Sequence, residues 1–423
     1  MERGRKAIRR RRREEICKSH EATRENIPVD IVIEILTRLP PKSLMRFKSV
    51  SRLWSSVICS QYFTNRFLKA SSPPRIYLWL GFGSKRVLLS SSASPDSDGT
   101  VTMSSFVVGQ DLTIPAMEGY HVSHVLRGLM CCTNRKSAQI YNTTTRQLVI
   151  LPDIEESNII AENHESKRVV YRIGHDPVLD QYKVFCTVSK RGSDRVGGKL
   201  VTCMPEHWVL LLGERDVSSR WRKIPSRCPP HHVLRQGLTI NGRMHYYLAL
   251  SLLSSFVLVS FDISSEEICM LQPPINRLPL FISLIECSGR VANLDHLDLE
   301  EKGVMKLWVM EDAGKNRWSR KTTLVLQPSD MHMVNMHMVD NMGLRVQGTT
   351  RNGEVIFVPE NSYGTRTGKI IVQPQNTTLF YVFIYNLEKN HMRKVDIKET
   401  SNRYLTRKWD VVGFDDTENL MYL

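Results

Sequence analysis

The chain has 423 residues, of which 41% are hydrophobic and 24% are charged, a composition typical of a globular protein with two or three domains. No apolar run approaches the roughly 18 residues that span a bilayer, and the N-terminus is charged rather than apolar. The nine cysteines are odd in number and lack CxxC spacing, which favours reduced thiols. The composition therefore predicts a protein of the nucleus and/or cytoplasm, with no membrane partner.

Residues 1–25 are predicted to form a basic, disordered tail. The formal net charge is +15, and residues 1–15 alone hold eight Arg and Lys against three Glu. A cluster of this kind is a candidate nuclear-localisation signal, or a solvated tail that only aids solubility; its residues are Lys6, Arg9, Arg10, Arg11, Arg12 and Arg13. Counterion release would retain it on any nucleic acid, so we expect nucleic acid only as a non-specific partner.

Residues 26–70 follow as a predicted module of short helices. Pro28 suits a first helical position and Asp30 suits the first turn, where the helix dipole favours negative charge. The following apolar residues recur with helical periodicity and predict one apolar stripe, made of Ile31, Val32, Ile35, Leu36 and Leu39.

Two further helices are predicted in the same module. Pro40-Pro41 ends the first helix and opens a second, which carries Leu44 and Phe47, and Ser51 is a candidate N-cap of a third. Its apolar residues are Leu53, Trp54, Val57 and Ile58. Helices this short do not enclose a stable core alone, so we expect a partner or the neighbouring domain to complete their apolar faces.

These residues resemble an F-box. The family pattern appears here as Ile27-Pro28-Val29-Asp30, Arg38-Leu39-Pro40, Lys42-Ser43-Leu44 and Val50-Ser51-Arg52-Leu53-Trp54. Ile27, Ser51 and Arg52 depart from the usual Leu, Cys and Lys, with similar shape or charge. The resemblance implies binding to a Skp-type adaptor and, through it, to a cullin scaffold. The adaptor contacts that we predict from it are Ile27, Pro28, Ile31, Ile35, Leu36, Leu39, Pro40, Leu44, Val50 and Trp54, some of which, Trp54 especially, could instead hold the helices together. The alternative is an ordinary helical subdomain.

Residues 71–75 form a predicted linker, and residues 76–423 a predicted all-β domain of short apolar runs separated by turn residues. A strand pattern recurs at intervals of roughly 50 to 75 residues, with equivalent points at Asn142, Gly213, Asp262, Glu311 and Asn386. Asn241-Gly242 is a strong two-residue hairpin signal. We therefore expect helices followed by an irregular, Kelch-like β-propeller, with a β-sandwich as the alternative.

The β domain also resembles the F-box-associated domain of plant F-box proteins. The likeness spans about residues 120 to 325, whereas the part from Met331 departs from it. It rests on Arg127–Cys131, Ile140–Thr145, Gly174–Pro177, Lys183-Val184, Thr239–Gly242, Phe261-Asp262 and Leu307–Asp312. We interpret these residues as structural, with Asn and Asp closing turns and tryptophans packing blades.

Catalytic motifs for phosphate loops, zinc sites and nucleophile elbows are absent from the sequence. Met331–Asp340 is a tandem five-residue duplication rich in His and Met, ligands that suit Cu(I). We interpret it as a duplicated flexible loop, and we expect no cofactor, no metal and no catalytic residue.

Together the two resemblances imply a non-catalytic substrate-recognition subunit of a Skp/cullin/F-box ubiquitin ligase, which binds an unknown target protein through the β domain. One alternative is a nuclear scaffold that binds nucleic acid through the basic tail. A propeller enzyme, the other alternative, requires His, Asp and Glu that converge at a central channel.

Overall fold

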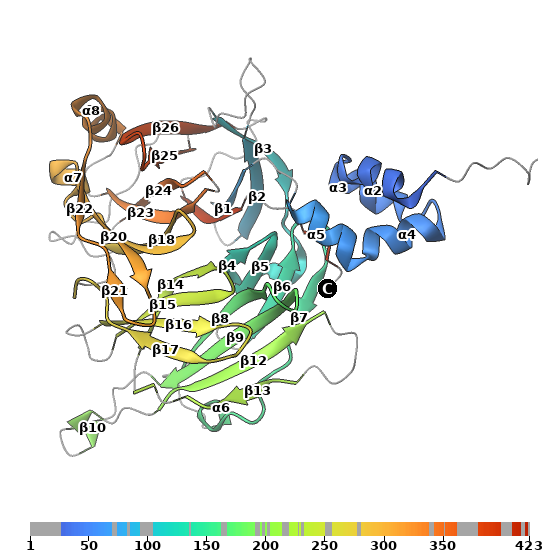
Figure 1. Ribbon diagram of the computed structural model, residues 1–423, viewed down its shortest axis with the longest axis horizontal. Coiled ribbons are helices and arrows are strands. Elements are labelled where there is room, and N and C mark those ends of the chain that lie inside the picture. Colours follow the sequence, from blue (N-terminus) through green and yellow to red (C-terminus); the bar gives the residue numbers. More distant parts are fainter. Residues whose placement is uncertain are drawn as a thin grey trace, which may run out of the picture. The chain divides into compact units, whose positions relative to one another are not determined.

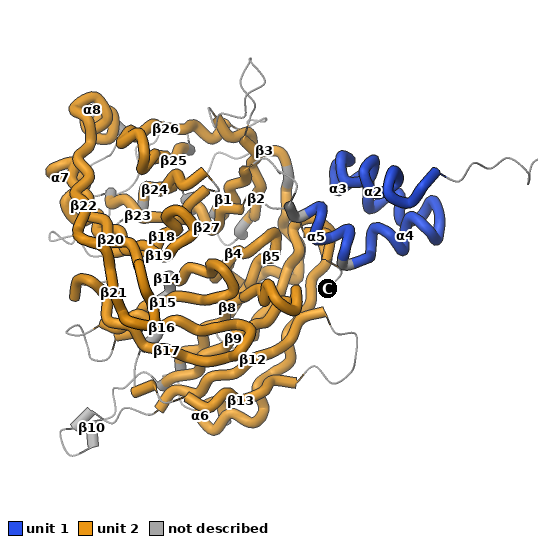
Figure 2. The backbone as a smooth tube through the Cα atoms, viewed as in Figure 1, with its two compact units in different colours: residues 1–70 blue, residues 71–423 orange. Residues whose placement is uncertain are grey.

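The computed structural model describes residues 27–69, 74–82, 85–93, 105–134, 137–161, 167–190, 195–196, 199–200, 204–213, 220–226, 228–229, 232–249, 256–276, 281–337, 342–350, 352–361, 380–398, 408–415 and 419–421. The chain divides into two compact units, residues 1–70 and residues 71–423 (Figure 2). The predicted basic tail, with Lys6 and Arg9–Arg13, lies outside the described residues. No helix in the described ranges is long and apolar enough to cross a membrane.

The described residues of the first unit, 27–69, form four short helices, which are α2 (Val29–Thr37), α3 (Pro41–Phe47), α4 (Arg52–Cys59) and α5 (Gln61–Lys69). Pro41 takes the first position of α3, as predicted. Pro28 precedes α2 as its N-cap rather than lying inside it, because its backbone is extended and its carbonyl accepts the N–H groups of Ile31 and Val32. The helix therefore begins one residue later than the sequence predicted.

Among the described residues, the main sheets of the second unit are one of eight strands, one of five and three of four, and we divide the eight-stranded sheet in two to number blades 1 to 6 (Figure 1). The strands of each blade are named from the first strand outward. Blade 1 has β27 (Lys408–Asp415), β1 (Arg75–Phe82), β2 (Lys85–Ala93) and β3 (Ser105–Asp111); blade 2 has β4 (His121–Leu126), β5 (Leu129–Thr133), β6 (Ala138–Asn142) and β7 (Leu148–Ile150); blade 3 has β8 (Lys167–Asp176), β9 (Gln181–Lys190), β12 (Glu206–Leu212) and β13 (Arg222–Ile224).

The other three blades complete the unit. Blade 4 has β14 (His232–Ile240), β15 (Arg243–Ala249), β16 (Phe256–Asp262) and β17 (Ile268–Leu271); blade 5 has β18 (Ile282–Cys287), β19 (Arg290–Asp295) and β20 (Val304–Asp312), with β21 (Arg317–Trp318) and β22 (Thr322–Val325) both on β20; blade 6 has β23 (Met342–Thr349), β24 (Glu354–Asn361), β25 (Phe380–Asn386) and β26 (His391–Lys398). Minor elements are η1 (Pro115–Met117), α6 (Asn158–Ala161), β10 (Arg195–Val196), β11 (Lys199–Leu200), α7 (Leu299–Lys302) and α8 (Pro328–His337). Strand β1 begins at Arg75, the last residue of the predicted linker.

The blades form a ring, because their first strands contact one another in the cyclic order β27, β4, β8, β14, β18, β23 and again β27. Blade 1 closes the ring by pairing β27, from the C-terminal part of the chain, with β1 from the start of the domain. Strand β26 of blade 6 also pairs in parallel with β3 of blade 1. This arrangement is the predicted propeller.

The apolar core is divided among the blade interfaces, each of which holds one cluster of buried side chains. Successive residues of a strand point to opposite faces, so neighbouring tyrosines serve different interfaces. Tyr246 packs into the cluster between blades 3 and 4, and Tyr247 into the cluster between blades 4 and 5. Two packed sheets would each bury one face only, which rules out the β-sandwich alternative.

Similar turns join the third and fourth strands of most blades. Asn142, Asp262 and Asn386 each accept two backbone N–H groups two and three residues later. The residue four positions after each has positive φ, between 48° and 64° in Arg146, Glu266 and Asn390. In blade 5 the turn is capped by Asp312 rather than by the predicted Glu311, one residue earlier. The interpretation of these residues as turn-forming is confirmed.

The turn that was predicted at Asn241-Gly242 joins β14 to β15. Both residues have positive φ, 48° and 73°, as a two-residue hairpin of this type requires. The amide Nδ2 of Asn241 also donates to the carbonyl of Gly289 in the corresponding turn of blade 5, at 2.9 Å. The turns therefore link blades as well as strands.

The residues after β27 extend across blades 2 and 3. Asn419, which is fully buried, donates from Nδ2 to the carbonyl of Arg127 at 2.8 Å and to the hydroxyl of Tyr182 at 3.0 Å. Its backbone N–H donates to the hydroxyl of Thr144 at 3.1 Å. This segment therefore adds polar contacts to two blades that β27 does not pair with.

The expectation of a flexible loop at Met331–Asp340 was wrong for its first seven residues. Residues 331–337 belong to α8, whose Val334 is buried in the cluster between blades 5 and 6. Asp330 in the first turn accepts the backbone N–H of Met392 at 2.8 Å. The duplication contributes to packing, because residues one turn apart, such as Met331 and Val334, lie on the inner side of a helix.

Candidate functional site

The helical unit has a small core of its own. The side chains that face inward from all four helices are Val32, Ile33, Leu36, Leu44, Val57, Ile58, Phe63 and Phe67. Trp54 is half-buried, and its ring meets that of Phe47 edge to face with centroids 5.0 Å apart. This contact joins α3 to α4 and is the kind that adds about 1 kcal/mol beyond area burial.

Polar contacts fix the helix ends and the spacing between helices. Ser51 caps α4 by accepting the N–H of Trp54 at 3.1 Å, as predicted, and Ser60 caps α5 by accepting the N–H of Phe63 at 3.2 Å. Glu34 of α2 pairs with Arg38 at 2.9 Å and with Arg66 of α5. The hydrogen bond from Arg38, aided by the charge of Arg66, lowers the pKa of Glu34.

A second set of apolar residues points out of the unit. Ile31 and Ile35 on α2 are 51% and 47% exposed, although they lie in the stripe that was predicted to face one way. Val50 before α4 and Leu53 on α4 are 62% and 51% exposed. The predicted stripe is therefore two stripes, of which Val32, Ile33 and Leu36 form the buried one.

The predicted adaptor residues separate into three groups by burial. The exposed ones are Ile27, Pro28, Ile31, Ile35, Pro40 and Val50; the half-buried ones are Leu39 and Trp54; the fully buried ones are Leu36 and Leu44. The prediction omitted three exposed residues, Val29, Leu53 and Tyr62. Leu53 and Trp54 are neighbours in the sequence, and both fit the apolar periodicity predicted for this helix. Periodicity therefore gave no reason to choose Trp54 over Leu53 as an adaptor contact.

We define the exposed set Ile27, Ile31, Ile35, Val50 and Leu53 as the apolar ridges. Large aliphatic side chains at half exposure or more are ordinary when they are scattered. Here they concentrate in a unit of four short helices. Exposed apolar side chains that gather on one unit are common at interaction sites, so we take this set as the candidate interface of the helical unit.

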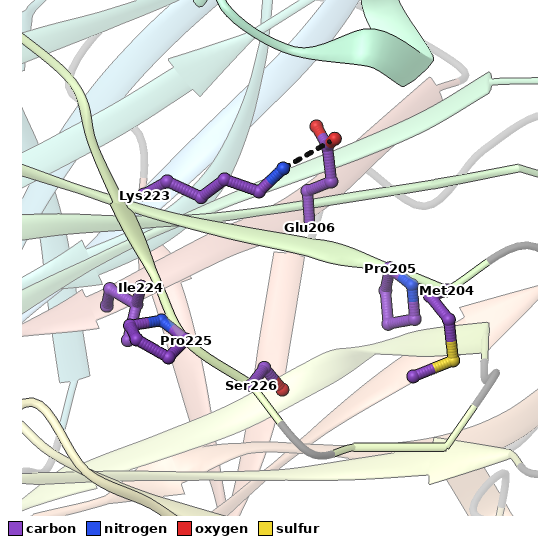
Figure 3. Close-up of a pocket in the computed structure, with 7 residues that line it drawn as sticks. All are labelled: Met204, Pro205, Glu206, Lys223, Ile224, Pro225 and Ser226. Atoms are coloured by element: carbon purple, nitrogen blue, oxygen red, sulfur yellow. Dashed lines mark hydrogen bonds and ion pairs between the residues drawn. The ribbon is translucent and has the colours of Figure 1, made fainter.

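The β domain offers a pocket of about 460 Å³ beside β12 and β13 (Figure 3). It is lined by Met204, Pro205, Glu206, Lys223, Ile224, Pro225 and Ser226. Lys223 reaches Glu206 at 2.9 Å, and the second carboxylate oxygen of Glu206 accepts the hydroxyl of Ser157 at 2.5 Å. Both charged groups are therefore engaged in structural contacts, and the lining supplies neither a thiol nor an imidazole.

Several thiols and imidazoles inside the β domain are held in their neutral forms. Burial raises the pKa of Cys131 to about 12, and it lowers the pKa of His124 to about 4, in both cases against the charged form. Within the ranges that the structure describes, no three His, Cys, Asp or Glu residues gather as metal ligands would. These groups have the protonation states of core residues, since a catalytic cysteine needs a lowered pKa.

The β domain also exposes apolar side chains at the end of one hairpin. Val178 and Leu179, between β8 and β9, are 77% and 57% exposed. Asp176 fixes the turn by accepting both of their N–H groups, and His175 and Asp180 pair across it at 2.7 Å. The tip is therefore a rigid, apolar projection.

The chain matches two family models, the F-box domain over residues 25–66 and the F-box associated beta propeller domain over residues 77–419. It is 58% identical to an F-box/kelch-repeat protein of Arabidopsis thaliana, over 98% of this chain and 94% of the relative. It is 54% identical to an F-box protein of the same plant, over 100% of this chain and 98% of the relative. A third similar protein, an F-box/LRR-repeat protein of Arabidopsis thaliana, shares 38% identity over 97% of this chain and 90% of the relative. The chain therefore belongs to the F-box proteins that carry an F-box-associated β-propeller domain.

Proposed function

We propose that this protein is the substrate-recognition subunit of a Skp/cullin/F-box ubiquitin ligase. The helical unit binds a Skp-type adaptor, which connects it to a cullin, and the propeller binds a target protein. The observation that carries the proposal is the pair of apolar ridges on the unit that matches the F-box model. The protein itself catalyses no bond change in this proposal.

In this mechanism the protein acts by holding the target close to the conjugating enzyme. A target held on the propeller stays near the conjugating enzyme that the cullin carries, which converts an encounter in solution into a reaction at high effective concentration. A propeller suits this role because each blade interface has its own packed core, and the ring resists deformation.

In this proposal the two faces of α2 have different roles, one in packing the helical unit and the other in binding the adaptor. Val32, Ile33 and Leu36 hold α2 against the other helices, so the unit folds around them. Ile31 and Ile35 contribute little to that core and are free to be covered by the adaptor. We accordingly propose the exposed members of the predicted set as direct contacts, and Leu36 and Leu44 as supports behind them.

The test is affinity capture of the tagged full-length chain, with detection of a Skp-type adaptor and a cullin. The variant is Ile31→Asp/Ile35→Asp, which places two charges on the ridge and leaves the buried stripe intact. The matched control is Val178→Asp/Leu179→Asp, which makes the same kind of change on the exposed hairpin of the propeller.

Capture of adaptor and cullin by the wild type and the control, with loss of both from the ridge variant, supports the proposal. Capture by the ridge variant at wild-type level, or by none of the three chains, contradicts it. Proteins that are captured equally by the wild type and the ridge variant are candidate targets, because they attach to the propeller alone.

For the cellular location we propose the nucleus and/or the cytoplasm, on the composition of the chain and on the cluster Lys6 and Arg9–Arg13. A fluorescent fusion in which these six residues are replaced by Gln tests the signal. Loss of nuclear fluorescence would support it, and an unchanged distribution would leave the cluster as a solubilising tail.

A further inference from the structure

The helical unit carries more positive than negative charge, and several of its cations have no ion-pair partner among the described residues. Residues 27–69 contain seven Arg and Lys against two acidic residues, Asp30 and Glu34. Glu34 is already engaged by Arg38 and Arg66. Lys42, Arg46 and Arg52 are exposed and form no ion pair with a described residue.

Two of these three cations are close to exposed apolar residues along the chain, and the third lies on the same helix as one of them. Arg52 stands between Val50 and Leu53, the two exposed residues at the start of α4. Arg46 precedes Val50 by one turn, in which the carbonyls of Arg46 and Phe47 accept the N–H groups of Ser49 and Val50. Lys42 lies one helical turn before Arg46 on α3, so the two share a face.

We propose that the partner which covers the ridges presents an apolar surface bordered by carboxylates, and that Lys42, Arg46 and Arg52 steer its association. The inference rests on the proposed function and specifies the partner's surface. We call these three residues the basic rim. Charge at the border of an interface acts mainly on the rate of association, because water and salt reduce its contribution to final affinity.

A protein fits this surface better than a nucleic acid does. Phosphate backbones are bound by cations together with polar groups, and they make no use of half-exposed aliphatic side chains. An apolar centre with a charged border is the usual anatomy of a protein–protein interface. The described residues of the unit hold one carboxylate outside the Glu34 contacts, the exposed Asp30, so the unpaired charge of the unit is mainly positive.

The experiment measures the association of the full-length chain with a purified Skp-type adaptor, by surface plasmon resonance at about 50, 150 and 500 mM salt. The rim variant is Lys42→Glu/Arg46→Glu/Arg52→Glu. The matched control is Lys315→Glu/Arg320→Glu/Lys321→Glu, three exposed cations of the propeller without a described ion pair, which changes the net charge by the same amount. Binding of each chain to a DNA duplex is recorded in parallel.

We expect the association rate of the wild type to fall about tenfold between the lowest and highest salt, and the rim variant to associate about tenfold more slowly at the lowest salt only. The control should match the wild type. Equal association rates of the rim variant and the wild type, with adaptor bound, would overturn the inference and leave the proposed function standing. Absence of adaptor binding by the wild type would overturn both. Loss of duplex binding by the rim variant with unchanged adaptor association would assign the basic rim to nucleic acid and overturn the inference.

Discussion

Truncation of the half-exposed residues of α2 should weaken adaptor binding without unfolding the helical unit. The variant is Ile31→Ala/Ile35→Ala. Full burial of an Ile side chain stabilises by about 1.5 to 3 kcal/mol, and these two are 51% and 47% exposed before binding. About half of that value is therefore left for a partner to gain from each, or about 1.5 to 3 kcal/mol for the pair. The dissociation constant should rise by about 10- to 150-fold.

The neighbouring pair on the same helix is the comparison. Val32 and Leu36 are 5% and 0% exposed, so Val32→Ala/Leu36→Ala removes core contacts. Leu→Ala in a core costs about 2 to 5 kcal/mol, which is enough to open a unit of this size. Adaptor binding then falls because the unit unfolds rather than because a contact is lost.

Hydrogen exchange read by mass spectrometry separates the two causes, because it reports residues 27–69 apart from the propeller. The half-exposed pair should lower the protection of α2 only in part, and the buried pair should abolish it. Calorimetry of adaptor binding supplies the affinities. An exposed-pair variant that binds like the wild type, or that loses protection across the unit, would refute the division of α2 into a core stripe and a ridge.

Three further outcomes are expected from the propeller. Gly242→Ala should destabilise it by more than about 1 kcal/mol in urea, because φ is +73° there and the new Cβ would lie 2.7 Å from Pro177; an unchanged midpoint would contradict this. Asn419→Ala should cost about 1 to 3 kcal/mol in urea, since its amide donates to the carbonyl of Arg127 and to the hydroxyl of Tyr182, and Asn419→Asp should not restore the bond to Arg127 because a carboxylate cannot donate. The free energy of unfolding should fall as the pH drops from about 6.5 towards 4. Burial lowers the pKa of His124, His245 and His296 to about 4 each, so these imidazoles bind protons in the unfolded chain at a higher pH than in the folded one. The loss by pH 5 is on the order of 2 kcal/mol for each histidine, and urea titrations at pH 5, 6 and 7 measure it.

The strand pattern made most of the propeller predictable. Asn142, Asp262 and Asn386 were placed as equivalent points because a carboxamide or carboxylate recurs where a strand of apolar residues ends, and each proved to cap the same turn. The closure of blade 1 by β27 was not predictable, because nothing local in Lys408–Asp415 shows that it pairs with Arg75–Phe82. Strand pairing over that separation depends on the geometry of the whole ring.

The helical prediction failed where periodicity is ambiguous. A run such as Ile31-Val32-Ile33 is apolar at every position, so a period of 3.6 residues fits more than one stripe. The packing of α5 against α2 decides which stripe is buried, and that contact joins residues far apart in the chain, such as Glu34 and Arg66, which are 32 positions apart. Sequence therefore identified the helix and its apolar residues, and the structure separated the exposed ones from the buried ones.

The two units differ in how much of their apolar surface they bury on folding. This difference favours different ways of binding a partner. Every blade interface of the propeller encloses a packed cluster, so its surface is left with turns and isolated projections such as Val178 and Leu179. Under the proposed function, loops and hairpin tips would contact the target, and such segments vary easily without disturbing the ring. The helical unit keeps Ile31, Ile35 and Leu53 exposed, so its folding leaves apolar area to be gained on binding. Under the proposed function, the exposed apolar side chains of the helical unit would bind the adaptor, and the propeller would remain free to bind a different partner.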